Sequence, residues 1–238
     1  MSAFAANTMT EPPGKYECQE YSIPVAGRVV RLLGPKYPHA LNALPGARQR
    51  AEEDGYKPYW ALPSPAAVML AEYVIGHVEP SPDPVLELGA GLGIVGISLS
   101  MAGHRVVVTD YDEDSLAFAR ASAKLNGVEL HAVQPLDWRS PPSDSYALIV
   151  GSDVAYERRS LQPIAALLAA CLKSSGKAFI SDLNRATAGE FPEALRSVEL
   201  VFDTVATRAK AIPAFDAVDN RVFNGRVFRI QKSSDSNR

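Results

Sequence analysis

The sequence predicts an α/β fold in which a mostly parallel sheet of seven strands is covered by helices on both faces. From residue 84 onward, short apolar runs rich in β-branched residues alternate with segments of helical periodicity. The first of these runs leads directly into a glycine-rich turn. At the end of the chain two strand-like runs, 198–208 and 226–231, have no good helix between them. They predict an antiparallel hairpin that closes the sheet.

The composition is that of a globular protein with a sizeable core. The chain has 238 residues, of which 47% are hydrophobic and 21% are charged, and its formal net charge is -3. A nucleic-acid-binding domain normally has a strongly basic surface, so the charge gives no support for a nucleic-acid partner. No stretch approaches the roughly 18 apolar residues of a membrane span, and no targeting segment is recognised at the start. We expect a cytoplasmic protein without a membrane partner.

Cysteine and histidine spacing predicts neither a disulfide nor a metal site. Cys18 and Cys171 are far apart in the sequence and belong to no Cys-x-x-Cys pattern. The histidines form no cluster with the spacing of metal ligands. They are His39, His77, His104 and His131.

Residues 1–56 are expected to form an extension to a main domain at 57–238. Residues 1–17 are rich in Ala, Thr, Pro and Gly and are expected to be mobile. Residues 21–33 predict two short strands around a turn at Ala26-Gly27. Residues 44–56, with a charged run, predict a loop and a short solvated helix.

The main domain is predicted to begin with a helix at Ser64-Pro65. Serine caps free N–H groups, and proline fits the first turn because its missing N–H has no partner there. Helical spacing continues up to Gly76. The strands that follow are predicted at 84–88, 105–110, 128–134, 146–151 and 177–181, and the helices at 94–102, 114–126, 160–173 and 188–198.

The clearest chemical signal is the segment 87–96, Glu-Leu-Gly-Ala-Gly-Leu-Gly-Ile-Val-Gly, between a predicted strand and a predicted helix. Glycines let this turn be tight and let a ligand approach the backbone at the carboxyl ends of the strands. Two cofactors fit the pattern. Gly91, Gly93 and Gly96 match the dinucleotide fingerprint, whereas Gly89, Gly91 and Gly93 match that of S-adenosylmethionine (SAM). Asp110, at the end of the second strand, suits the ribose hydroxyls of either.

Three features favour SAM over NAD. The carboxylate of Glu87 suits the ammonium group of the methionine part and would be poorly placed beside a pyrophosphate. Asp137 and Trp138 follow the third strand, where the acid can accept from the adenine amine and the indole can lie against the ring. The residues after Asp153 are used up by the remaining strands and helices, which leaves no separate substrate domain of the kind an NAD enzyme usually needs.

Four segments carry a resemblance to the seven-β-strand protein-lysine methyltransferases called methyltransferase family 16. Within that family the chain is most similar to the electron-transfer-flavoprotein β-subunit lysine methyltransferases. The segments are Pro-Tyr-Trp-Ala-Leu-Pro at 58–63, the glycine loop at 86–96, Leu-Asp-Trp at 136–138 and Ser-Asp-Val-Ala-Tyr at 152–156. The chain departs from the flavoprotein enzymes at 181–185, Ser-Asp-Leu-Asn-Arg, where they tend to have a Gly-Asp-Pro-Gly-Arg-like segment, and at 63–65, where many relatives have tryptophan before proline.

The resemblance implies a Rossmann-like three-layer sandwich, SAM as methyl donor, S-adenosylhomocysteine as product and a protein lysine as acceptor. Its acidic-x-x-aromatic signature implies that Asp153 and Tyr156 position the amine. The residues expected to bind the cofactor are Trp60, Glu87, Gly89, Gly91, Gly93, Asp110, Asp137, Trp138 and Ser152.

Other interpretations of the same residues stay open. Asp153 can cap the next helix with Tyr156 packed against it, and both tryptophans can be packing residues. The same fold can methylate a small molecule, bind SAM or a nucleotide without turnover, or carry NAD in an oxidoreductase.

Overall fold

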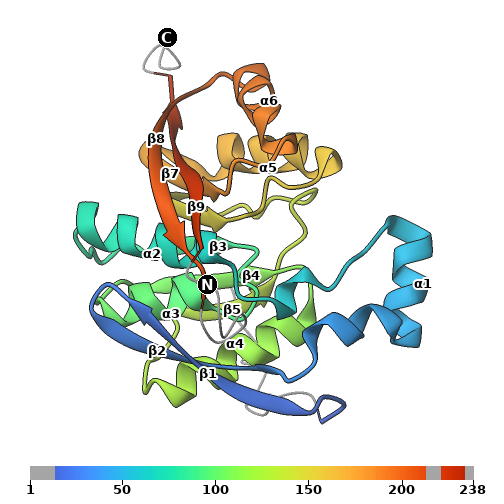
Figure 1. Ribbon diagram of the computed structural model, residues 1–238. Helices are drawn as coiled ribbons and strands as arrows, with labels where there is room; N and C mark the ends of the chain where they lie inside the picture. Colours follow the sequence, from blue (N-terminus) through green and yellow to red (C-terminus); the bar gives the residue numbers. More distant parts are fainter. Residues whose placement is uncertain (1–13, 213–220, 234–238) are drawn as a thin grey trace.

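Seven strands form one sheet in the order β5-β4-β3-β6-β7-β9-β8 (Figure 1). The structure is a computed structural model that describes residues 14–212 and 221–233. The five strands β5, β4, β3, β6 and β7 are parallel to one another, and β9 is antiparallel to both β7 and β8. The strands are β3 (Val85–Leu88), β4 (Val106–Asp110), β5 (Ala132–Pro135), β6 (Tyr146–Ser152), β7 (Leu172–Asp182), β8 (Leu200–Lys210) and β9 (Val222–Lys232). The predicted fold class, with its closing hairpin, is confirmed.

Helices cover both faces of this sheet. Strand residues alternate between two hydrophobic clusters: Val85 faces one cluster and Leu86 the other. The first cluster includes side chains of α2, α3 and α4, and the second includes those of α5 and α6. The helices are α1 (Pro45–Asp54), α2 (Pro65–His77), α3 (Ile94–Met101), α4 (Glu113–Leu125), α5 (Arg158–Cys171) and α6 (Phe191–Ser197), with short 3-10 turns η1 (Pro38–Ala43), η2 (Tyr59–Ala61) and η3 (Thr187–Gly189).

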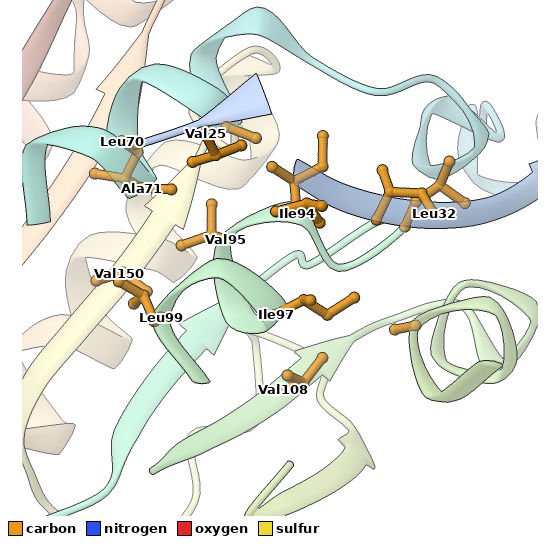
Figure 2. Close-up of a cluster of buried hydrophobic side chains, with 14 of the residues drawn as sticks. Val25, Leu32, Leu70, Ala71, Ile94, Val95, Ile97, Leu99, Val108 and Val150 are labelled. Atoms are coloured by element: carbon orange, nitrogen blue, oxygen red, sulfur yellow. The ribbon is translucent and has the colours of Figure 1, made fainter. Parts of the chain in front are cut away.

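The predicted N-terminal hairpin is formed by β1 (Cys18–Val25) and β2 (Arg28–Pro35). Its two turn residues, Ala26 and Gly27, both have positive φ angles of 48° and 75°, as a tight two-residue hairpin turn requires. Figure 2 shows Val25 and Leu32 of the hairpin close to Ile94 of α3. The extension therefore shares the core of the sheet domain. Of the tail predicted at 1–17, residues 1–13 lie outside the described residues.

The order of the strands changes direction between β3 and β6, which are neighbours in the sheet although β4 and β5 lie between them in the sequence. The loops after β3 and β6 consequently leave the sheet side by side. In open parallel sheets this is the place where ligands bind.

Some boundaries differ from the predicted ones for local reasons. The third strand covers only 132–135, because the amide of Val128 still bonds back to Ala123 at the end of α4. The fifth begins earlier, at Leu172, which pairs with Tyr146 across an irregularity in the register. Helix α6 is shorter than predicted because η3 precedes it and Pro192 occupies its first turn.

Candidate active site

A cavity of about 570 Å³ opens at the carboxyl ends of β3, β4 and β6. Its volume falls within the roughly 300–1,000 Å³ that is usual for small-molecule sites. The predicted site residues that line it are Trp60, Gly89, Gly91, Asp110, Asp137, Trp138, Ser152, Asp153 and Tyr156. Two further predicted residues, Glu87 and Gly93, are not part of this lining in the part of the chain that the structure describes. The fold thus brings distant segments of the sequence together around one space.

The glycine loop after β3 needs its glycines for conformation and for space. Gly89, Gly91 and Gly93 have φ angles of 60°, 57° and 88°, in the left-handed region that other residues rarely adopt. A Cβ at Gly91 would lie 3.1 Å from the carbonyl oxygen of Trp60. The loop backbone is therefore open toward the cavity and closely packed against the segment before α2.

Asp110 fastens this loop to the next strand. Its Oδ2 accepts a hydrogen bond of 2.9 Å from the Gly91 amide, and its Oδ1 accepts one of 2.9 Å from the Asp112 amide. Burial raises the pKa of this carboxyl, while these two amide donors oppose the shift. The Ser115 side chain is a third hydrogen-bond partner of this carboxyl, so about one of its four acceptor sites remains for a ligand hydroxyl.

Glu87 lies behind the loop rather than in the cavity lining. Its side chain is 1% exposed, and burial raises its pKa to about 8. The carboxylate hydrogen-bonds the backbone of Gly96, and a Cβ at Gly96 would lie only 2.3 Å from Oε2. That oxygen has no hydrogen-bond partner among the described residues. The expected contact with an ammonium group stays a prediction.

The side of the cavity after β5 is formed by Asp137 and Trp138. Arg139 holds the Asp137 carboxylate through contacts of 2.6–3.0 Å and lowers its pKa. Trp138 lies close to the glycine loop, since a Cβ at Gly89 would be 3.1 Å from its ring. The buried indole Nε1 has no partner among the described residues. It is a donor that a ligand can satisfy.

Tyr111 is a lining residue that sequence reasoning missed. It directly follows Asp110 and is 48% exposed at the cavity, an unusual position for a large aromatic ring. The signal was present in the sequence as an aromatic residue next to a strand-ending acid. Such a ring offers a flat apolar surface to a ligand.

Trp60 both packs in the core and lines the cavity. Its ring stacks on Phe118 with centroids 5.6 Å apart, and its Nε1 donates to the Tyr56 hydroxyl at 3.1 Å. The Tyr56 hydroxyl in turn donates to Asp112, which also pairs with Arg50 of α1 at 3.0 Å. Trp60 is therefore a packing residue, and this role is compatible with the predicted contact to a cofactor.

Asp153 lies at the other side of the cavity, directly after β6. Its φ of 57° is unfavourable for a residue with a Cβ, and such conformations gather at functional sites. Oδ2 accepts from Ser64 Oγ at 2.9 Å and from Arg185 Nη2 at 2.7 Å. Oδ1 is buried and has no partner among the described residues. One oxygen is fully occupied and the other is free to accept.

Tyr156 lies between Tyr59 and Arg185. Its ring meets that of Tyr59 edge-on at 5.4 Å, and the Arg185 guanidinium carbon is 5.7 Å from the ring centroid. Burial, with a smaller contribution from the Glu157 charge, raises the pKa of the phenol. Tyr156 is therefore a neutral hydrogen-bonding group at physiological pH.

Within the described residues, no three His, Cys, Asp or Glu side chains gather as a metal-binding group. None of the helices described there is long and apolar enough to cross a membrane.

A family model described as lysine methyltransferase matches residues 60–194. The chain is 35% identical over 111 residues to histone-arginine methyltransferase METTL23 of Xenopus laevis, covering 42% of this chain and 46% of the relative. It is 35% identical over 100 residues to protein N-lysine methyltransferase METTL21A of Danio rerio, covering 38% and 45%. It is 28% identical over 112 residues to release factor glutamine methyltransferase of Aliivibrio fischeri, covering 41% and 39%. The matched segment thus spans less than half of each of these relatives.

Solved structures share the fold at low sequence identity. The ribosomal protein L11 methylase of Lactobacillus delbrueckii superposes with a TM-score of 0.57 at 22% identity, covering 72% of this chain and 81% of its own. A TehB-like SAM-dependent methyltransferase of Corynebacterium glutamicum has a TM-score of 0.50 at 20% identity, covering 82% and 98%.

Proposed function

The chain belongs to the lysine methyltransferase family, and from this premise we propose that it transfers a methyl group from SAM to the side-chain amine of a protein lysine. The single observation that carries the proposal is the cavity. It joins the glycine loop, Asp110 and Trp138 at one side to Asp153 and Tyr156 at the other, and the buried Oδ1 of Asp153 has no partner among the described residues. One space thus has room for a donor and an acceptor.

The lining of the cavity fits SAM. The open backbone at Gly89 and Gly91 and the acceptor oxygens of Asp110 suit the sugar and amino-acid parts. Trp138 offers a flat ring and an unpartnered Nε1, and Tyr111 adds a second exposed ring. When bound, SAM supplies an electrophilic methyl group on a positively charged sulfur.

The residues of the chain then have to hold an amine in line with that methyl group and exclude water. Asp153 Oδ1 accepts a hydrogen bond from the amine, and the neutral Tyr156 hydroxyl fixes its orientation. At an ordinary pKa near 10.4, only about one lysine amine in a thousand is neutral at pH 7. A partly dry cavity favours the neutral form, which is the form that attacks.

The identity of the acceptor is the part of the proposal that most needs a test, because the relatives named above act on lysine, arginine or glutamine according to their names. We place the catalytic domain at 57–238 and the protein in the cytoplasm, as the sequence predicts. A small-molecule amine is the second candidate, since such an amine would need the same acceptor, Asp153, in the same cavity.

The decisive experiment incubates the purified protein with tritiated SAM and a cell extract. The proteins are precipitated and hydrolysed, and the labelled amino acids are separated. We expect labelled methyl-lysine, and about 100-fold less of it with D153N. Label confined to the small-molecule fraction would favour the second candidate. SAM binding without transfer to any fraction would indicate a binding module, and the proposal would be wrong.

A further inference from the structure

We propose that Arg185 makes this site selective for an amine over a guanidinium acceptor, by occupying one oxygen of Asp153 and by keeping a fixed positive charge beside the other. The inference rests on the proposed function and deepens it. Arg185 is a specificity-determining residue in this account rather than a group that reacts.

Asp153 has one carboxylate oxygen that is fully occupied and one that is not. A carboxylate oxygen has two lone pairs, and Oδ2 uses both of them, one for Ser64 at 2.9 Å and one for Arg185 at 2.7 Å. Oδ1 is buried and has no partner among the described residues. Asp153, which lines the cavity, therefore keeps unused lone pairs on one oxygen only.

An amine and a guanidinium make different hydrogen bonds to a carboxylate. An amine needs one hydrogen-bond acceptor and reaches it from many directions. A guanidinium presents a planar fork of parallel N–H groups that matches both oxygens of a carboxylate at once. Because Oδ2 is already occupied, Asp153 can accept the single hydrogen bond of an amine, but only one of the two parallel N–H groups of a guanidinium.

The positive charge of Arg185 also affects an amine and a guanidinium differently. A lysine amine can lose its proton before it enters, whereas a guanidinium stays charged at every pH a protein experiences. The guanidinium of Arg185 lies against both Asp153 and the ring of Tyr156. It therefore repels a second guanidinium and favours the neutral form of an amine.

Arg185 is held next to Asp153 by the contacts of its own backbone. Its backbone amide donates to Asp182 Oδ2 at 3.2 Å, and Asp182 is buried and paired with Arg226. The side chain of Arg185 is 46% exposed, so it borders the cavity without filling it.

Other charged or titratable groups surround this pair, and all of them are present in the wild-type protein and in both Arg185 variants. A difference in pH dependence between R185Q and R185K then reports the loss of the positive charge at position 185. They are Asp182 and Arg226 behind the pair, Tyr59 from η2, Tyr156, Glu157 and Arg159 after β6, and Asp110 across the cavity.

The test compares R185Q, R185K and the wild-type protein in the tritiated SAM assay, with labelled methyl-lysine and methyl-arginine measured separately. R158Q is the matched control, because Arg158 pairs with Glu190 outside the cavity. For R185Q we expect the ratio of methyl-arginine to methyl-lysine to rise about tenfold. We expect the pH of half-maximal rate to rise by about one unit, since the amine loses its positive neighbour.

R185K keeps the charge and one donor, so both quantities should stay near the wild-type values, as they should in R158Q. Thermal melting shows whether each variant is folded. An unchanged ratio and pH midpoint in folded R185Q would overturn the role of Arg185 while leaving the proposed function intact. If R185Q does not fold, a shifted pH midpoint in R185K overturns it. Absence of methyl-lysine with wild-type protein would overturn the proposed function, and this inference with it.

Discussion

The amide of Gly91 donates a hydrogen bond of 2.9 Å to Asp110 Oδ2, which ties the glycine loop after β3 to the end of β4. The hydroxyl of Ser115 in α4 holds the same residue from the other side, donating to the Gly91 carbonyl at 2.8 Å. The loop is thus fixed before any ligand arrives. A preformed site binds its ligand without a further cost of ordering.

Replacing Gly91 by alanine is expected to lower both stability and SAM affinity. At a φ of 57°, alanine costs about 1–2 kcal/mol, and its Cβ would lie 3.1 Å from the Trp60 carbonyl oxygen. G76A is the control, because Gly76 is an exposed residue of α2 where an added Cβ would meet none of the described atoms within 4 Å. It should gain about 0.5–1 kcal/mol. Denaturant melts and calorimetric titration with SAM measure both effects, and equal behaviour of the two variants would contradict this account of the loop.

D153N is expected to lose methyl transfer and to keep SAM binding. The amide is almost the same size as the carboxylate, but it has only one acceptor oxygen and no charge to pair with Arg185. The incoming amine loses its fixed partner, and the rate should fall about 100-fold. Calorimetric titration with SAM and the tritium assay separate the two quantities. Parallel loss of binding and turnover would assign Asp153 to cofactor binding or to folding.

Glu87 should make the protein less stable as the pH rises. The folded protein keeps the Glu87 proton up to a pKa of about 8, whereas the unfolded chain releases it near a pKa of about 4.3. Between these values the folded state binds more protons than the unfolded state. The free energy of unfolding therefore falls by about 1 kcal/mol for each pH unit and levels off above about pH 8.

E87Q removes this titration and should flatten the pH dependence of the melting temperature. A weaker slope of the same sign remains, because burial also raises the pKa of Asp110. Melting curves of E87Q and wild-type protein at several pH values between the two pKa values provide the comparison. Identical slopes would mean that the Glu87 carboxyl is not protonated in the folded protein.

D112N should loosen α1 without unfolding the domain. Asparagine keeps the side-chain acceptor that caps α4 at the Asp114 amide, but it loses the ion pair with Arg50. That ion pair is partly exposed, so its loss should lower the local stability of α1 by about 1 kcal/mol. Trypsin should then cut after Arg48 and Arg50 about fivefold faster.

Mass spectrometry of early tryptic fragments identifies these cuts. D203N is the control, because Asp203 pairs with Arg229 at the distant β8–β9 hairpin. The same cleavage rate at α1 in both variants and in the wild-type protein would show that the Asp112 network does not hold this helix.

Local signals make much of the fold predictable. Ser64 is recognisable in the sequence as a helix cap, and its Oγ accepts from the Ala66 amide at 3.1 Å. The Ala26-Gly27 turn, the alternation of strands and helices and the closing hairpin are also present as predicted. Each of these depends on neighbours within a few residues, which the sequence displays directly.

Contacts between segments that are distant in the sequence cannot be predicted from local patterns. Asp153 meets Ser64 and Arg185, which are 89 and 32 residues away, and no local pattern specifies either pairing. Glu87 lies behind the loop, in the space that Gly96 leaves beside its carboxyl, and no local pattern indicates this placement; its contact with the ligand stays a prediction. Side-chain direction at a strand end depends on which small residues surround it in three dimensions.

The Ser64 hydroxyl serves two purposes, since it accepts from the first turn of α2 and donates to Asp153. A substitution that frees the carboxylate from Ser64 also removes a helix cap, so widening the range of acceptors by this route lowers the melting temperature. Laboratory evolution toward new acceptors should therefore change position 185 first. It should reach position 64 only after stabilising changes have accumulated elsewhere.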